Sequence, residues 1–234
     1  MNRIRKHNNR FQVLIAPHQK YNPGFEFLLG SWTDEGLMGF QVLEFNTYYE
    51  AENISTEQPD INWDQLVEFH KDAYIFLRSH INDVVKKTNI AVQLKSYLLT
   101  PMQTKNKLFD RVLQYQSQKG EQDTEFRLVY DMNDIISFII VNPWTRNLQE
   151  IETYLVNHER LNIFNTIRQN GIVHLIGRTD IGTTYEILLV PSLLDNWMEW
   201  RNLNINILPN SKLNAGLREC INTQRNIDKT FALR

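Results

Sequence analysis

The feature that most constrains the fold is a long apolar stripe between residues 63 and 85. Apolar and aromatic residues, with one histidine, recur there at steps of three and four over about six turns: Trp63, Leu66, Val67, His70, Tyr74, Leu77, Ile81, Val84 and Val85. Asn62 stands where an N-cap residue is expected. The stripe predicts an amphipathic helix whose long face must be covered by a sheet or by other helices.

The hydrophobic period changes from that of a helix to that of a strand several times along the chain. After a short apolar run over 11–16, strand-like segments occur as pairs around turns, at 25–29 with 37–45, at 124–131 with 135–141 and at 172–178 with 183–190. A single strand is expected over 90–98. Helices are expected at 100–119, 142–170 (with a break midway), 192–203 and 211–228. We therefore predict an α+β fold with a mixed or largely antiparallel sheet built from hairpins, with helices packed on it.

The expected domain organisation is simple. Residues 1–10 are polar and basic without periodicity, which predicts a flexible basic N-terminal arm. No linker rich in Gly, Ser or Pro divides the rest of the 234 residues, so a single domain is expected over 11–234.

The cellular compartment is predicted from features that the sequence does not contain. The longest apolar run, Ile135–Val141, is far shorter than the roughly 20 residues of a membrane-spanning helix. No export signal is recognisable at the N-terminus, and the lone Cys220 cannot form an intramolecular disulfide. We expect an intracellular protein, cytoplasmic or nuclear, with no membrane contact.

Charge is distributed unevenly along the chain. Residues 1–20 carry a formal charge of +5 without one acid, residues 21–70 carry −10 without one Lys or Arg, and the remainder carries +3. A basic arm of this kind can neutralise nucleic-acid phosphates. Arg3, Arg5, Lys6 and Arg10 are the candidate nucleic-acid contacts.

The acidic block is also rich in aromatic residues, and aromatic side chains are common anchors at protein interfaces. Those near expected turns, with the acids beside them, form a candidate surface for a protein partner that presents a basic surface. Its residues are Trp32, Asp34, Glu35, Tyr48, Tyr49, Glu50 and Glu52.

Motifs that would identify a reaction are missing. The chain has neither a G-x-x-x-x-G-K-[ST] loop nor a G-x-G-x-x-G turn, and its six histidines are scattered singly. His174 fits a core position, and the acids Asp180 and Glu186 lack the lysine that a carboxylate-plus-lysine nuclease needs. Asp131, Asp134 and Glu150 could meet at the end of a hairpin and hold a divalent cation.

The sequence therefore favours a non-enzymatic intracellular adaptor, a subunit of a larger assembly that binds its partner through residues 21–70. No catalytic residue, metal site or cofactor is assigned. Two alternatives stay open at this stage: a nucleic-acid-binding factor that uses the basic arm, and a metal-dependent hydrolase or nuclease at the three carboxylates just named.

Overall fold

A computed structural model describes residues 4–15, 41–56, 63–118, 133–180, 183–204 and 208–232. The chain forms two compact units, the first from 1–74, 98–136 and 180–184, and the second from 75–97, 137–179 and 185–234. Helices and two sheets, one antiparallel and one mixed, confirm the predicted α+β class. The single folding domain expected over 11–234 stays a prediction.

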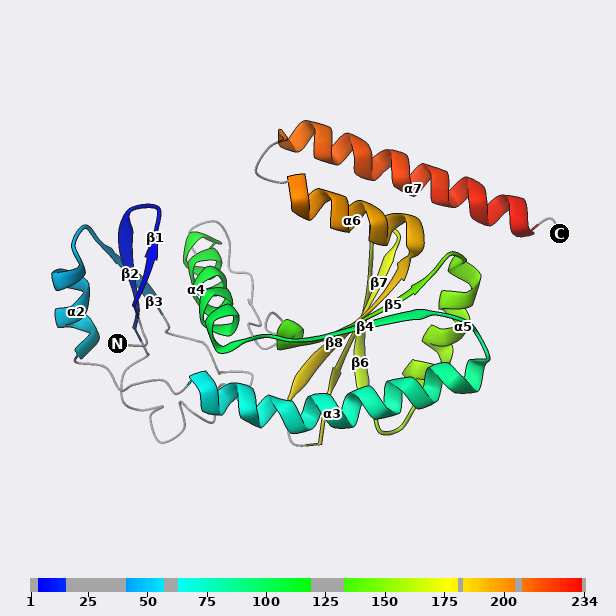
Figure 1. Cartoon of the computed structure of the whole chain (residues 1–234), viewed down its shortest axis with the longest axis horizontal. Coiled ribbons are helices and arrows are strands. Elements are labelled where there is room, and N and C mark those ends of the chain that lie inside the picture. Colours follow the sequence, from blue (N-terminus) through cyan, green and yellow to red (C-terminus); the bar gives the residue numbers. More distant parts are fainter. Residues whose placement is uncertain are drawn as a thin grey trace. The chain divides into compact units, whose positions relative to one another are not determined.

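The first unit contains a small antiparallel sheet in the order β1-β2-β3, formed by Ile4–His7, Arg10–Ile15 and Gln41–Phe45. Helix α2 (Tyr48–Thr56) covers it, and the buried side chains of Ile4, Val13 and Ala51 form its centre. Helix α4 (Pro101–Gln118) and the start of α3 (Trp63–Thr88) also belong to this unit, as does a short 3-10 turn, η3 (Asn133–Ile135). Figure 1 shows these elements in blue to green.

Residues expected within a flexible arm form a strand in this structure. Asn8 and Asn9 both have positive φ (47° and 63°), which is the conformation of a tight hairpin turn, and they join β1 to β2. Arg5 then lies inside the unit: its guanidinium donates to Gln12 Oε1 at 2.7 Å and to Asp110 Oδ1 at 2.7 Å. These contacts hold β1 in place.

Helix α2 lies in a segment where the sequence predicted a loop. The Thr47 and Glu50 side chains form a reciprocal capping box, in which Glu50 Oε2 accepts from the Thr47 N–H at 3.1 Å and Thr47 Oγ1 accepts from the Glu50 N–H at 3.3 Å. This cap satisfies backbone donors at the helix start, and Ala51 anchors the helix on the small sheet.

The second unit is built on a five-stranded sheet in the order β4-β5-β8-β7-β6, made of Gln93–Leu98, Ile136–Asn142, Thr184–Pro191, Ile172–Arg178 and Ile163–Gln169. Strands β5 and β8 are parallel, and β6 and β7 are antiparallel, so this sheet is mixed, as predicted. In Figure 1, α3 lies on one side of the strands, and α6 (Ser192–Asn204) and α7 (Asn210–Ala232) lie on the other.

One expected helix is wrong in its second half. The helix predicted over 142–170 ends after α5 (Thr145–Val156), and the residues that follow form β6. Asn170 and Gly171 have φ of 53° and 80°, so they make the tight turn of a β6–β7 hairpin and do not end a helix. Two other expected strands, 25–29 and 124–131, lie outside the described residues.

The two faces of the large sheet are covered to different extents. On one face the side chains at the centre of the sheet are buried: Phe138, Ile140, Leu175, Tyr185, Ile187 and Leu189. Helix α5 lies on this side, because Arg168 of β6 pairs with Glu152 of α5 at 2.5 Å. The Tyr185 hydroxyl donates to the Leu161 carbonyl just beyond α5. We call this the covered face.

The C-terminal helix is tied to the start of α5 by specific hydrogen bonds. Asp228 accepts from the Thr145 backbone N–H at 3.2 Å and from its hydroxyl at 2.6 Å, and Gln224 donates to the Pro143 carbonyl at 3.0 Å. A carboxylate near the N-terminal N–H groups of a helix also interacts favourably with its dipole. Residues far apart in the sequence thus join one unit.

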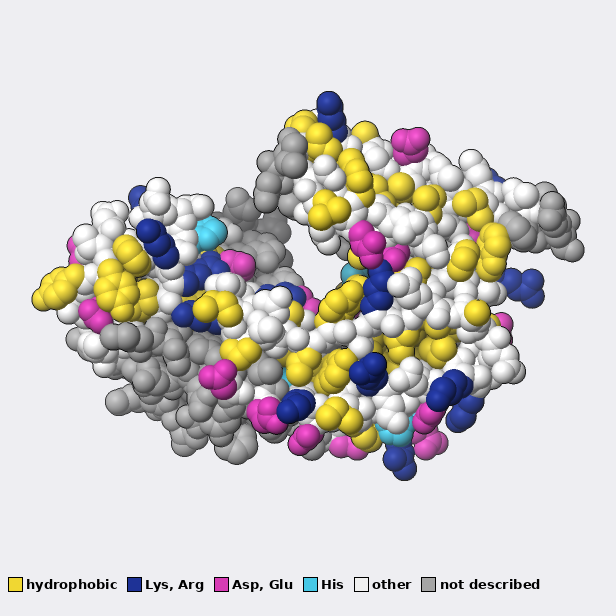
Figure 2. All heavy atoms as spheres, in the orientation of Figure 1, with side chains coloured by type: hydrophobic (Ala, Val, Ile, Leu, Met, Phe, Trp, Pro, Cys, Tyr) yellow, Lys and Arg dark blue, Asp and Glu magenta, His cyan; other side chains and the backbone are white. Residues whose placement is uncertain are grey.

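No helix among the described residues is long and apolar enough to cross a membrane. Figure 2 shows why for α3: both acidic and basic side chains lie along its outer surface.

A substitution at Gly177 tests the packing of the covered face. A β-carbon there would overlap the Tyr185 ring, which is fully buried and held by its hydroxyl. We expect Gly177→Ala to lower the free energy of unfolding by about 1–3 kcal/mol, measured by urea denaturation. In a Tyr185→Leu background the alanine should cost clearly less. An equal cost in both backgrounds would contradict this account of the packing.

Candidate functional site

The other face of the five-stranded sheet is buried only in part, and we call it the open face. Val141, Ile176, Thr184 and Val190 on this face are buried. Side chains at alternate positions of β5, β7 and β8 point to it, since residues two apart in a strand share a face. Its half-buried members are Ser137, Ile139, Ile172, His174, Arg178, Glu186 and Leu188. Apolar strands carrying a few charged groups on an accessible face are typical of a small-molecule site.

Glu186 and His174 form the central ionisable pair of the open face. His174 Nδ1 lies 2.7 Å from Glu186 Oε1, and the two side chains are 28% and 16% exposed. Among the described residues, Oε2 of Glu186 has no hydrogen-bond partner. The imidazole holds one carboxylate oxygen while the other can accept a proton or a hydrogen bond from a bound molecule.

Sequence reasoning placed His174 in the core and did not find this pair. The signal that could have found it is the hairpin predicted around Asp180. The two residues stand at equal distances on either side of Asp180, separated by 12 positions. Such positions lie opposite each other when a hairpin is symmetric.

Arg178 brings a positive charge to the same face. It lies four residues beyond His174 in β7, about 13 Å along the strand. Its guanidinium lies 5.7 Å from the centre of the Phe164 ring, and its Nε is buried with no hydrogen-bond partner in the part of the chain that the structure describes. A guanidinium is suited to binding phosphate oxygens.

A second charged cluster joins β4 to α6. Lys95 Nζ donates to Asp195 Oδ2 at 2.8 Å and to Glu199 Oε1 at 2.6 Å, and Lys95 and Asp195 are 15% and 7% exposed. Hydrogen bonds to Asp195 and then to Glu199 raise the pKa of Lys95 above its usual value. The ammonium therefore stays charged and holds α6 to the sheet.

The predicted partner-binding residues fall into two groups. Trp32, Asp34 and Glu35 lie outside the described residues. The remaining four, Tyr48, Tyr49, Glu50 and Glu52, all lie on α2.

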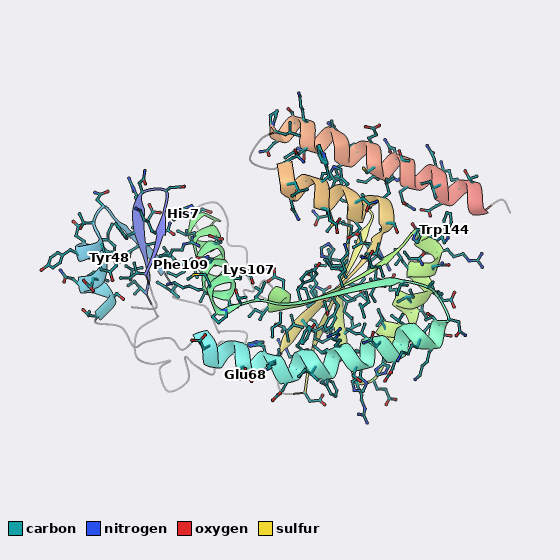
Figure 3. All side chains as sticks on the ribbon, in the orientation of Figure 1. His7, Tyr48, Glu68, Lys107, Phe109 and Trp144 are labelled. Atoms are coloured by element: carbon teal, nitrogen blue, oxygen red, sulfur yellow. The ribbon has the colours of Figure 1, made fainter. Side chains whose placement is uncertain are left out.

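On α2 the four side chains differ in their roles. Tyr49 is 71% exposed. Tyr48, labelled in Figure 3, packs edge-on against Phe11, and its hydroxyl donates to Glu52. Glu50 caps its own helix. The partner contact assigned to these residues stays a prediction.

The predicted nucleic-acid contacts are engaged within the first unit where they are described. Arg5 is buried against Phe109, Lys6 lies over the Phe11 ring, and Arg10 pairs with Glu44 at 3.2 Å. Arg3 lies outside the described residues. Their contact with nucleic acid stays a prediction.

The predicted carboxylate cluster is not seen as a metal site. Asp134 pairs with Lys107, labelled in Figure 3, and Asp131 lies outside the described residues. Glu150 lies on the exposed surface of α5. No group of three or more His, Cys, Asp or Glu among the described residues could hold a metal ion.

Comparisons with known proteins give a likeness of fold. No protein-family model matches the sequence, and none of the curated proteins matches it significantly. The small alarmone synthetase 1 from Bacillus subtilis superposes with a TM-score of 0.51 at 13% identity, over 73% of this chain and 94% of that one. The same protein bound to its product pppGpp gives a TM-score of 0.50 at 12% identity, with the same shares covered.

This likeness corrects the functional prediction. The protein compared, small alarmone synthetase 1, is an enzyme, so the prediction of a non-enzymatic adaptor subunit of an assembly is wrong, and the alternatives of a nucleic-acid-binding factor or a hydrolase are not supported. The prediction was wrong because the lack of known motifs does not exclude an enzyme. A fold can persist at 13% identity although motifs are no longer recognisable.

The Lys95 cluster gives a stability test. Lys95→Met leaves the buried Asp195 carboxylate without its partner, so we expect a loss of about 3 kcal/mol in the free energy of unfolding, measured by urea denaturation. The matched control is Lys71→Met, because the Lys71–Glu68 pair is 54% and 70% exposed and should contribute under about 1 kcal/mol. Equal losses in both variants would show that the Lys95 cluster does not hold α6.

Proposed function

We propose that the chain is an enzyme of the alarmone synthetase type, which transfers a pyrophosphate group to a guanosine nucleotide. The observation that carries the proposal is the likeness of fold to small alarmone synthetase 1, which extends over 94% of that protein. The open face supports it, because it presents a carboxylate and a guanidinium on the central strands of the sheet.

The chemistry can be written from the product bound in the related structure, pppGpp. This molecule is a guanosine triphosphate with a further diphosphate on the ribose. Its formation requires a ribose hydroxyl oxygen to attack the β-phosphorus of a nucleoside triphosphate. The bond from that phosphorus to the oxygen bridging to the α-phosphate breaks, a nucleoside monophosphate leaves, and the hydroxyl proton passes to a base.

The open face offers residues for these roles. Glu186 accepts the hydroxyl proton at Oε2, and His174 acts as a positioning residue because it holds Oε1 at 2.7 Å. Arg178 binds phosphate oxygens through its guanidinium. An intracellular location, expected from the sequence, suits an enzyme whose substrates are nucleoside triphosphates.

The direct test is product formation. The purified chain is incubated with GTP and with Mg²⁺ and ATP labelled in its β-phosphate, and the nucleotides are separated by anion-exchange chromatography. We expect label in a guanosine species with more phosphates than GTP, with AMP released in equal amount. Glu186→Gln should lower the rate by about 100-fold or more, because removal of a general base typically costs 10²–10⁴-fold.

Glu219→Gln is the matched control, since Glu219 is an exposed acid on α7. It should leave the rate unchanged. His174→Gln should cost less than Glu186→Gln, because it removes only the group that holds Oε1 of the carboxylate. If no pyrophosphate is transferred to GTP or to GDP by the folded wild-type chain, the proposed function is wrong.

A further inference from the structure

A cavity of about 670 Å³ lies on the side of the sheet opposite to the open face. It is lined by the C-terminal half of α3 and by residues 157–160, which follow α5. Both helices belong to the covered side of the sheet, because Arg168 of β6 pairs with α5 and the ring of His80 on α3 contacts that of His158. The volume lies within the range of small-molecule sites, roughly 300–1,000 Å³.

The cavity gathers positive charge. Lys86, Lys87 and Arg160 line it, and none of the three forms an ion pair within the described residues. Two acids, Asp83 and Glu159, line it as well, so the net formal charge is +1 with neutral histidines and +3 when both histidines are protonated. Figure 2 shows basic, acidic and histidine side chains gathered around this end of α3.

The two histidines provide the second, independent observation. The ring centres of His80 and His158 lie 5.5 Å apart. Nδ1 of His158 is buried with no hydrogen-bond partner among the described residues. Burial, together with the charges of His158 and Arg160, lowers the pKa of His80 below 6.5. An anion in the cavity would offset this repulsion.

We infer that this cavity binds a small phosphate-bearing anion, of the class of inorganic pyrophosphate or a nucleotide polyphosphate. Ammonium, guanidinium and imidazole groups converge on it, which is the donor set that phosphate oxygens prefer. A metal ion does not fit, because no described group of three His, Cys, Asp or Glu could hold one. The site is separate from the open face and does not depend on the proposed reaction.

Isothermal titration with inorganic pyrophosphate, without divalent cations and at pH 7, tests the inference. We expect saturable binding by the wild-type chain. The double variant Lys86→Gln/Arg160→Gln should bind at least tenfold more weakly. Both side chains are exposed, so the variant should fold, which its melting curve checks. Lys212→Gln, an exposed lysine on α7, is the matched control and should bind like the wild type.

Three outcomes would overturn the inference. One is an absence of binding up to several millimolar pyrophosphate, and another is undiminished binding in the double variant. The third is binding that Arg178→Gln abolishes and the double variant keeps, because the pyrophosphate would then occupy the open face. None of these outcomes bears on product formation, so failure here is distinguishable from failure of the proposed function.

Two further arms identify the source of the phosphate and the contribution of the histidines. If ATP binds more tightly than pyrophosphate, the ligand is a nucleotide, and if only pyrophosphate binds, the ligand is inorganic. Both results support the cavity as the binding site. Binding of adenosine with the same affinity as pyrophosphate would overturn the inference. NMR of the imidazole protons should show that pyrophosphate raises the pKa of His80, and an unchanged pKa under saturating ligand would contradict the site.

Discussion

The parallel pairing of β5 with β8 is the constraint on which the second unit depends. It runs in register from Ser137 opposite Glu186 to Asn142 opposite Pro191, and joins segments separated by more than forty residues. Because β8 is inserted between β5 and β7, Glu186 lies at the centre of the sheet beside His174. The same pairing places Tyr185 on the covered face, where its hydroxyl fixes the chain after α5.

The sheet then separates two regions with different electrostatics. On the covered side Arg168 is neutralised by Glu152, and at α6 Lys95 is neutralised by two carboxylates. Two groups of cations have no ion-pair partner among the described residues and face a candidate site: the guanidinium of Arg178 on the open face and the cations of the cavity beside α3. Charged groups that the fold leaves unpaired are available for ligands, which is why both proposals rest on them.

Local periodicity predicted the α+β class, the long helix α3 and the strands β7 and β8. It misjudged β6, because Asn170-Gly171 serves equally as a helix stop and as a hairpin turn, and only pairing with β7 decides between them. Helix α2 was missed although Thr47 and Glu50 carry a capping box. The candidate site was missed because Glu186 and His174 meet through strand pairing, which no motif records and which only the symmetry of the hairpin predicted around Asp180 indicates.

The most direct test of the central claim is a crystal structure of the chain with GTP and a non-hydrolysable ATP analogue. The account predicts both nucleotides on the open face, with phosphate oxygens at Arg178 and a ribose hydroxyl about 2.6–3.2 Å from the Glu186 carboxylate. Nucleotides bound elsewhere, with Glu186 and His174 still paired and facing no ligand, would contradict the claim that the open face is the catalytic site.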